Sequence, residues 1–295
     1  MLLTLLLVTA RTGRAAEVVV VDGQGSTVRL AAPARRIIAL YGAFNEILVE
    51  MGLTGRIVAR TMADGDIPDV AGLPSIGTHM RPNQEMIVGL NPDLVLQMAG
   101  RKGASEPVEA LRRRGIPVAE FDPHGFAELF AAIEAVGALT GEPRAAQVLV
   151  ERMRARLDAL AVRLAGLDSR PRVFFEVRSP SLLAAGAGGI VDEVIRLAGG
   201  VNAVTEDRRI VRLGEEALYG LDPDVYIVQR GPMNAAPQPL AERPLYAPLR
   251  AVRQGRVLEV DERLFSRPGP RSVEAVEVLA RFLYPDRMNN LQENE

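Results

Sequence analysis

The chain has 295 residues, of which 48% are hydrophobic and 24% are charged, and its formal net charge at pH 7 is −2. These values are typical of a folded protein of one or two domains and exclude a disordered or fibrous chain. The balanced charge gives no indication of a nucleic-acid partner, although Lys102 is the only lysine and nearly every cation is an arginine, a side chain suited to forked contacts with carboxylates and phosphates.

The first residues form an apolar run from Leu2 to Ala10, followed by small residues. A bilayer span needs about 20 apolar residues, so this run is too short to be one. It is typical of a secretory signal peptide, which we predict over residues 1–16. Because the sequence contains no cysteine, there is no thiol for a disulfide or a lipid anchor. We therefore expect a soluble protein exported to a bacterial periplasm, and not a lipoprotein.

The next part of the chain alternates strands with helices. Residues 18–30 read VVVVDGQGSTVRL, which predicts a β-hairpin around an Asp-Gly-Gln-Gly turn. Short apolar runs then predict parallel strands at 35–40, 55–60, 93–97 and 115–121, and helical spacing of apolar residues predicts helices at 41–52 and 106–114. This alternation indicates an α/β lobe with a mainly parallel sheet, which we place at residues 17–140.

A long amphipathic helix is predicted in the middle of the chain, over residues 142–167. Its apolar stripe consists of Leu149, Met153, Leu157, Leu160 and Leu164. Thr140 is expected to cap its start and Gly166 to end it. At 1.5 Å per residue such a helix spans about 39 Å, enough to reach from one lobe to another. Residues 141–168 are therefore interpreted as a rigid connecting helix and not as a flexible hinge.

The alternation of strands and helices begins again after residue 170. Strands are predicted at 171–177, 223–229 and 255–261, and a helix at 188–200. They indicate a second α/β lobe over residues 169–295. The predicted fold is thus α/β, with two lobes of mainly parallel sheets joined by one long rigid α-helix.

One phrase occurs in both lobes. Residues 84–100 read QEMIVGLNPDLVLQMAG and residues 215–231 read EEALYGLDPDVYIVQRG. The identical pairs are Glu85/Glu216, Gly89/Gly220, Leu90/Leu221, Pro92/Pro223, Asp93/Asp224 and Gly100/Gly231. Each copy predicts a helix, a turn and an apolar strand. The match indicates an internal duplication; two ordinary helix-turn-strand units that solve the same local problem are the alternative.

Candidate binding residues follow the predicted strands, because ligands of open parallel sheets bind beyond the carboxyl ends of the strands. These positions hold Tyr41, Arg60, the run 98–102 with Arg101, Arg178, Arg230 and Arg267. If the strand ends of the two lobes face each other, they line an electropositive cleft suited to an anionic ligand with apolar parts. Alternatively, these arginines are ordinary surface residues of an arginine-rich chain.

Sequence motifs of catalysis are missing. The chain has no Gly-x-Ser-x-Gly, no Gly-x-x-x-x-Gly-Lys-Ser/Thr and no His-Glu-x-x-His. The two histidines, His79 and His124, lie in loop-like segments and cannot supply a three-histidine zinc site. We assign no catalytic residues and no metal ligands; a secreted α/β enzyme that uses His79 or His124 with a carboxylate is the alternative.

Several segments, taken in order, resemble a known family. They are residues 18–53 with the hairpin and first helix, QEMIVGLNPDLVL, the long middle helix, RLAGGVNAV and EEALYGLDPDVYIV. Their order and spacing, from about Val18 to Pro285, are similar to the substrate-binding proteins of ABC importers for ferric siderophores, haem and cobalamin, the class with a helical backbone.

The resemblance implies a cleft that binds one metal chelate, little closure on binding, and a glutamate on each lobe that docks onto arginines of a membrane permease dimer. The glutamates in the matching positions are Glu85 and Glu216. A structural reason is also open, because an acidic residue in the first turn of a helix interacts favourably with the helix dipole, by about 0.3–1 kcal/mol.

The resemblance leaves the chelate open. The absence of tryptophan makes a corrinoid less favoured, haem could find an axial donor in Tyr41 or His79, and the arginines suit a ferric siderophore or an oxyanion. We expect a monomeric periplasmic protein without an intrinsic cofactor or a nucleic-acid partner. It would deliver a ferric siderophore or haem to an ABC permease and its ATPase; a cobalamin binder and a sensor without a transporter are alternatives.

Overall fold

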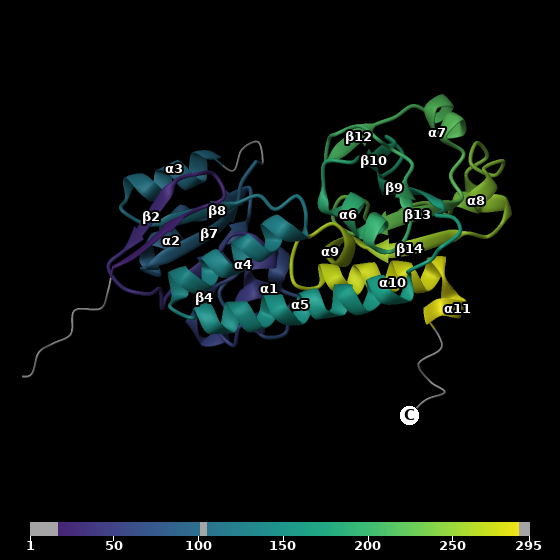
Figure 1. Ribbon diagram of the computed structural model, residues 1–295. Coiled ribbons are helices and arrows are strands. Elements are labelled where there is room, and N and C mark those ends of the chain that lie inside the picture. Colours follow the sequence, from purple (N-terminus) through teal and green to yellow (C-terminus); the bar gives the residue numbers. More distant parts are fainter. Residues whose placement is uncertain (1–16, 101–104, 289–295) are drawn as a thin grey trace, which may run out of the picture.

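The computed structural model describes residues 17–100 and 105–288, so the predicted signal peptide at 1–16 and the candidate Arg101 lie outside the described residues. Figure 1 shows two α/β lobes side by side, with one long helix, α5 (Pro143–Arg163), running along both of them. The α/β class and the two-lobed arrangement are as predicted.

The N-terminal lobe is built on a fully parallel four-stranded sheet in the order β4-β3-β7-β8. Its strands are β3 (Ile37–Ala39), β4 (Ile57–Ala59), β7 (Leu94–Met98) and β8 (Val118–Phe121), and its helices are α1 (Gly42–Glu50), α2 (Gln84–Gly89), α3 (Ser105–Arg113) and α4 (Phe126–Thr140). The predicted hairpin forms from β1 (Val18–Val21) and β2 (Thr27–Leu30), and a smaller one from β5 (Gly77–Thr78) and β6 (Arg81–Pro82). Single 3₁₀ turns lie at η1 (Thr54–Arg56) and η2 (Met62–Asp64).

The C-terminal lobe has a mixed sheet in the order β12-β10-β9-β13-β14, with β11 beside β9. Strands β9 (Arg172–Arg178), β11 (Val201–Asn202), β13 (Val225–Arg230) and β14 (Val257–Asp261) pair in parallel, and β10 (Leu183–Ala185) and β12 (Ile210–Arg212) are antiparallel. Its helices are α6 (Ile190–Leu197), α7 (Glu215–Leu221), η3 (Leu240–Glu242), α8 (Arg250–Arg253), α9 (Glu262–Phe265), α10 (Ser272–Leu283) and α11 (Pro285–Met288). Both sheets are therefore mainly parallel, as predicted.

The connecting helix is shorter than predicted. It begins at Pro143 and ends at Arg163, so it spans about 32 Å at 1.5 Å per residue. The expected cap is wrong: Thr140 closes the preceding helix α4, where its hydroxyl donates to the Val136 carbonyl over 2.8 Å. No helix was predicted from the sequence over the residues of α4. Gly166, at φ 65°, ends the turn that follows the helix and not the helix itself.

The predicted apolar stripe of α5 is buried, with Leu149, Met153, Leu160 and Leu164 at most 8% exposed and Leu157 packed against them. This stripe belongs to one apolar core that continues from the N-terminal sheet to the C-terminal lobe, where α10 packs beside α5. Two arginines one turn apart reinforce the connection: Arg152 bonds to Glu50 of α1, and Arg156 makes a forked bond of 2.9 and 2.7 Å to Glu277 of α10. The core and these bonds connect the lobes rigidly.

The repeated phrase folds in the same way twice, as α2 followed by β7 and as α7 followed by β13. In each copy the residue before proline has a positive φ, 47° at Asn91 and 36° at Asp222, which Asn and Asp tolerate better than other side chains. The aspartates after the proline then accept backbone N–H groups at the start of the neighbouring strand, Asp93 from Arg36 at 3.0 Å and Asp224 from Arg172 at 2.8 Å. Local geometry thus explains most of the repeated letters.

Candidate functional site

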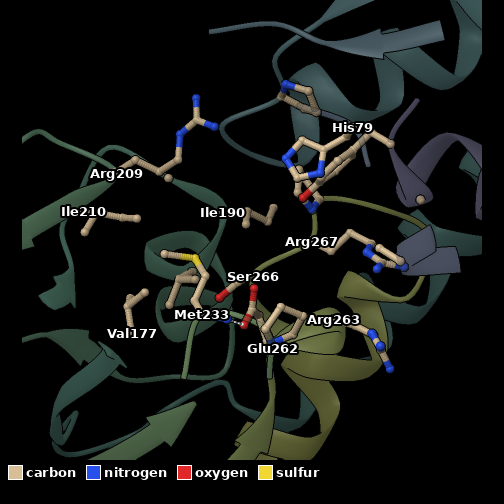
Figure 2. A pocket seen from close by; sticks show the side chains of 18 of the residues that line it. His79, Val177, Ile190, Arg209, Ile210, Met233, Glu262, Arg263, Ser266 and Arg267 are labelled. Carbon is tan, nitrogen blue, oxygen red and sulfur yellow. Dashed lines mark hydrogen bonds between the residues drawn. The ribbon is translucent and has the colours of Figure 1, made fainter. Parts of the chain in front are cut away.

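A cleft lies between the two lobes, at the ends of strands β3, β9 and β10. The N-terminal lobe contributes Leu40, Tyr41, Gly42, Thr61, Ala63, His79 and Pro123, and the C-terminal lobe contributes Val177, Ala185, Gly189, Ile190, Val191, Arg209, Ile210, Pro232, Met233, Glu262, Arg263, Ser266, Arg267 and Pro268. Figure 2 shows His79 facing the apolar side chains of Val177, Ile190 and Met233. The lining is mostly apolar, with a few polar groups, which is the usual composition of a small-molecule site.

Tyr41 and His79 form the aromatic part of the N-terminal wall. Tyr41 follows β3 and precedes α1, and His79 lies in the turn between β5 and β6. Their rings make an edge-to-face contact, with centroids 6.0 Å apart and planes at 81°. A phenol and an imidazole at such a wall can stack on a flat ligand or donate to a metal ion.

The structure brings only some of the candidate binding residues together. Tyr41, His79 and Arg267 line the cleft, whereas Arg60, Arg178 and Arg230 are not among its lining residues. Each of those three bonds locally: Arg60 donates to the Ala71 carbonyl at 3.0 Å, Arg178 to the Ser181 hydroxyl at 3.1 Å, and Arg230 to Glu259 at 2.9 Å. A strand end brings the backbone near the cleft, but the direction of the side chain depends on its local partners.

The lining residues of the C-terminal lobe that were not predicted from the sequence include Arg209, Met233, Glu262, Arg263 and Ser266. Glu262 and Arg263 begin the short helix α9, and the other three lie in connecting segments or turns. Burial raises the pKa of Glu262, whose carboxylate accepts the Met233 N–H at 2.7 Å. No periodicity marks such positions, although Arg263 and Ser266 adjoin the predicted Arg267 in the segment LFSRPGPR.

The arginines of the cleft are paired with carboxylates of the other lobe. Arg209 contacts Asp122 at 2.7 Å, Arg263 contacts Asp66 at 2.5 Å, and Arg267 contacts Glu46 at 2.8 Å. The expectation of an electropositive cleft did not include these partners, each of which opposes the charge of one lining arginine.

The Arg267 pair belongs to a buried polar cluster behind the cleft. Asp64 Oδ2 accepts from the Thr61 hydroxyl at 2.6 Å and from the Asn45 amide at 3.0 Å. Burial raises the pKa of Glu46, and the nearby Arg267 opposes this shift. For Arg267, burial lowers the pKa, but the Glu46 carboxylate raises it, and the net shift is upward. Gly42 leaves room for this cluster, because a Cβ at that position would lie 2.3 Å from Asp64 Oδ1.

His124 lies outside the cleft lining, on the surface where the lobes meet. Its Nδ1 lies 2.9 Å from the Gly188 carbonyl and its Nε2 lies 3.4 Å from Asp122. No group of three or more His, Cys, Asp or Glu side chains suited to a metal ion occurs within 17–100 and 105–288. The two histidines thus occupy different environments and do not form one site.

The two repeated glutamates are exposed. Glu85 lies in the first turn of α2 and Glu216 in the first turn of α7, so each carboxylate is placed favourably toward a helix N-terminus and is accessible to a partner. Val88 and Tyr219, three residues further on in each helix, are also exposed, at 40% and 39%. Each lobe therefore presents an exposed glutamate with an exposed apolar or aromatic side chain one turn further on.

Comparisons with known proteins agree with this architecture. The family model described as "Periplasmic binding protein" matches residues 37–264. The chain is 29% identical to "Uncharacterized ABC transporter substrate-binding lipoprotein YvrC" of Bacillus subtilis strain 168, over 90% of this chain and 85% of that protein. Within the part of the chain that the structure describes, no helix is both long enough and apolar enough to cross a bilayer.

Two solved structures share both lobes with this chain. One is the periplasmic heme-binding protein RhuT from Roseiflexus sp. RS-1 in apo form, with a TM-score of 0.74 and 25% identity over 86% of this chain and 99% of that one. The other is the periplasmic vitamin B12 binding protein BtuF of Vibrio cholerae, with a TM-score of 0.72 and 26% identity over 85% of this chain and 97% of that one.

Proposed function

Because the chain belongs to the periplasmic binding protein family, we propose that it captures a metal chelate in the cleft between its lobes and delivers it to an ABC importer. The proposed site is the lining of the cleft, with Tyr41 and His79 as its aromatic and metal-donor groups and the apolar side chains opposite them as the second wall. The resemblance of the fold to both a haem binder and a vitamin B12 binder supports the chelate class. This role needs binding and docking, and no chemical step.

The observation that supports delivery most directly is the recurrence of an exposed glutamate at one position in each lobe. Helix α2 presents Glu85 and helix α7 presents Glu216, both in the first turn. The backbone physics of the repeat explains the proline and the aspartates, but it does not require this carboxylate. A partner with two similar subunits, such as a permease dimer with its ATPase, would need one contact on each lobe. We place the protein in the periplasm, as a monomer.

The docking role is tested by Glu85→Ala combined with Glu216→Ala. We expect uptake through the cognate importer to fall to background, with the affinity for the chelate unchanged within about twofold, because both carboxylates lie outside the cleft. Glu215→Ala is the matched control, since Glu215 is an exposed neighbour in the same helical turn. Full uptake by the double variant, or a loss of affinity, would contradict the assignment.

The chelate itself is identified by purifying the protein from its native host and recording an absorption spectrum together with a native mass spectrum. A Soret band would identify haem, a broad charge-transfer band a ferric siderophore, and a corrin spectrum a cobalamin. A colourless protein that binds none of these in a thermal-shift panel would contradict the proposed ligand class.

A further inference from the structure

The cations of the cleft have one arrangement in common. Arg209, Arg263 and Arg267 all belong to the C-terminal lobe, and each is bonded to a carboxylate of the N-terminal lobe. We call these contacts the inter-lobe pairs: Arg209–Asp122, Arg263–Asp66 and Arg267–Glu46. In Figure 2 the three arginine side chains extend outward from the middle of the view, whereas Met233, Glu262 and Ser266 lie closer to the middle. Each guanidinium group is thus directed at the opposite lobe.

The Arg267–Glu46 pair is the most buried of the three, with side chains 10% and 9% exposed. Around it, the buried oxygens Asn45 Oδ1, Glu46 Oε2 and Asp64 Oδ1 have no hydrogen-bond donor among the described residues. Acceptors are therefore in excess beside this guanidinium. A further anionic group would add to that excess and would not fill an unmet need for an acceptor.

The Arg209–Asp122 pair lies at the other side of the cleft and is part of a wider contact between the lobes. Arg209 Nη2 donates to both oxygens of Asp122, at 2.7 and 2.9 Å. Nearby, the Phe126 N–H donates to Glu193 at 2.6 Å across the same boundary. An anionic ligand that contacted Arg209 would lie close to the Asp122 carboxylate, which would repel it.

The positive charge of the described lining is therefore opposed by carboxylates that lie just behind it. Each of the three lining arginines has a carboxylate partner, although the buried Nε of Arg263 has no acceptor, and Glu262 adds a carboxyl group to the lining itself. The rest of the lining near these groups is apolar, including Val177, Ile190, Ile210 and Met233.

We propose that the inter-lobe pairs hold the two lobes together and neutralise the cleft, so that it selects a chelate without net negative charge. This inference rests on the proposed function and specifies the ligand class of the same cleft. The arginines are then positioning residues: they do not bind the ligand, but their ion pairs fix the distance between the lobes and reduce the net charge beside the ligand. On the criterion of charge, an uncharged corrinoid fits this cleft better than haem, which carries two carboxylates, or ferric citrate.

The test compares three probes, cyanocobalamin, haemin and ferric citrate. Their affinities are measured by titration calorimetry or by a titration that follows the absorbance of the chelate. We expect the wild-type protein to bind cyanocobalamin at least about tenfold more tightly than either anionic probe. The variants Asp122→Asn, Asp66→Asn and Glu46→Gln each release one arginine while preserving the shape of its partner. We expect each variant to raise the affinity for haemin or ferric citrate by about threefold or more. Asp122 and Asp66 lie at partly exposed sites, so their variants test this expectation even if Glu46→Gln does not fold.

Glu259→Gln is the matched control, because it releases Arg230 from an ion pair outside the cleft and should leave all three affinities unchanged. Preferential binding of haemin or ferric citrate by the wild type, with no gain in the amide variants, would overturn the inference and leave the proposed function intact. Failure of every chelate to bind the wild type would overturn both.

Discussion

Replacement of Arg243 by methionine should be among the most destabilising single changes in the C-terminal lobe. The Glu176 carboxylate on β9 is completely buried and accepts from Arg243 Nη1 at 2.6 Å, from Arg243 Nη2 at 3.1 Å and from the Tyr226 hydroxyl at 2.6 Å. Burial and the Glu176 charge raise the pKa of Tyr226 well above its ordinary value, so this hydroxyl stays a donor. Without Arg243, the carboxylate would be buried with one neutral partner.

The expected cost is about 3–5 kcal/mol, the usual result of removing one partner from a buried ion pair. At about 2.1 cal/mol/K of unfolding entropy per residue, the melting temperature should fall by roughly 5–8 °C if the lobes unfold together. The double variant Glu176→Gln with Arg243→Met should recover part of this loss, because glutamine removes the buried charge and still accepts from Tyr226. Both effects are measured by calorimetry at neutral pH.

Arg230→Met provides the comparison, because Arg230 makes the same type of ion pair with Glu259 at a site where both side chains are about half exposed, 50% and 51%. Exposed ion pairs are screened by solvent and contribute little to stability, so the melting temperature should fall much less than that of Arg243→Met. If Arg243→Met and Arg230→Met shift the melting temperature equally, burial is not what makes the Glu176 pair important, and the reasoning is refuted.

Three further changes have opposite or pH-dependent outcomes. Gly42→Ala should destabilise the protein by about 1–3 kcal/mol, because its Cβ would lie 2.3 Å from Asp64 Oδ1. Gly220→Ala, in helix α7 with no atom within 4 Å of the new Cβ, should instead stabilise it by about 0.5–1 kcal/mol; equal urea midpoints for the two variants would contradict this. Backbone and side-chain bonds from Arg250 lower the pKa of Asp222 below its ordinary value of 3.8, so its charge stabilises the fold above that pH and ceases to do so as the pH falls through the lowered pKa. Asp222→Asn should therefore be less stable than the wild type at pH 6 and equally stable near pH 2, and a difference that persists in acid would contradict the assignment.

The sequence predicted those features that depend on neighbouring residues in the chain. The hairpin at 18–30, the strands, the apolar stripe of the connecting helix and both copies of the repeated phrase follow from periodicity and turn residues, and the structure contains all of them. Element ends were less well predicted: α5 ends four residues before its expected limit at 167, and Thr140 belongs to α4. Helix ends depend on competition between caps and packing, which the sequence alone does not resolve.

The candidate site was only partly predictable. Position after a strand correctly indicated that Tyr41 and Arg267 lie near the cleft, but the same criterion selected Arg60, Arg178 and Arg230, which bond to local partners outside its lining.

By itself, then, the sequence determined the α/β class, the two lobes, their rigid connection and the position of one glutamate on each lobe, because local periodicity and an internal repeat encode them. Only the tertiary structure decided the charge of the cleft. Arg267 and Glu46 are separated by 221 residues in the chain and Arg209 and Asp122 by 87, and only the packing of one lobe against the other brings each cation to its carboxylate.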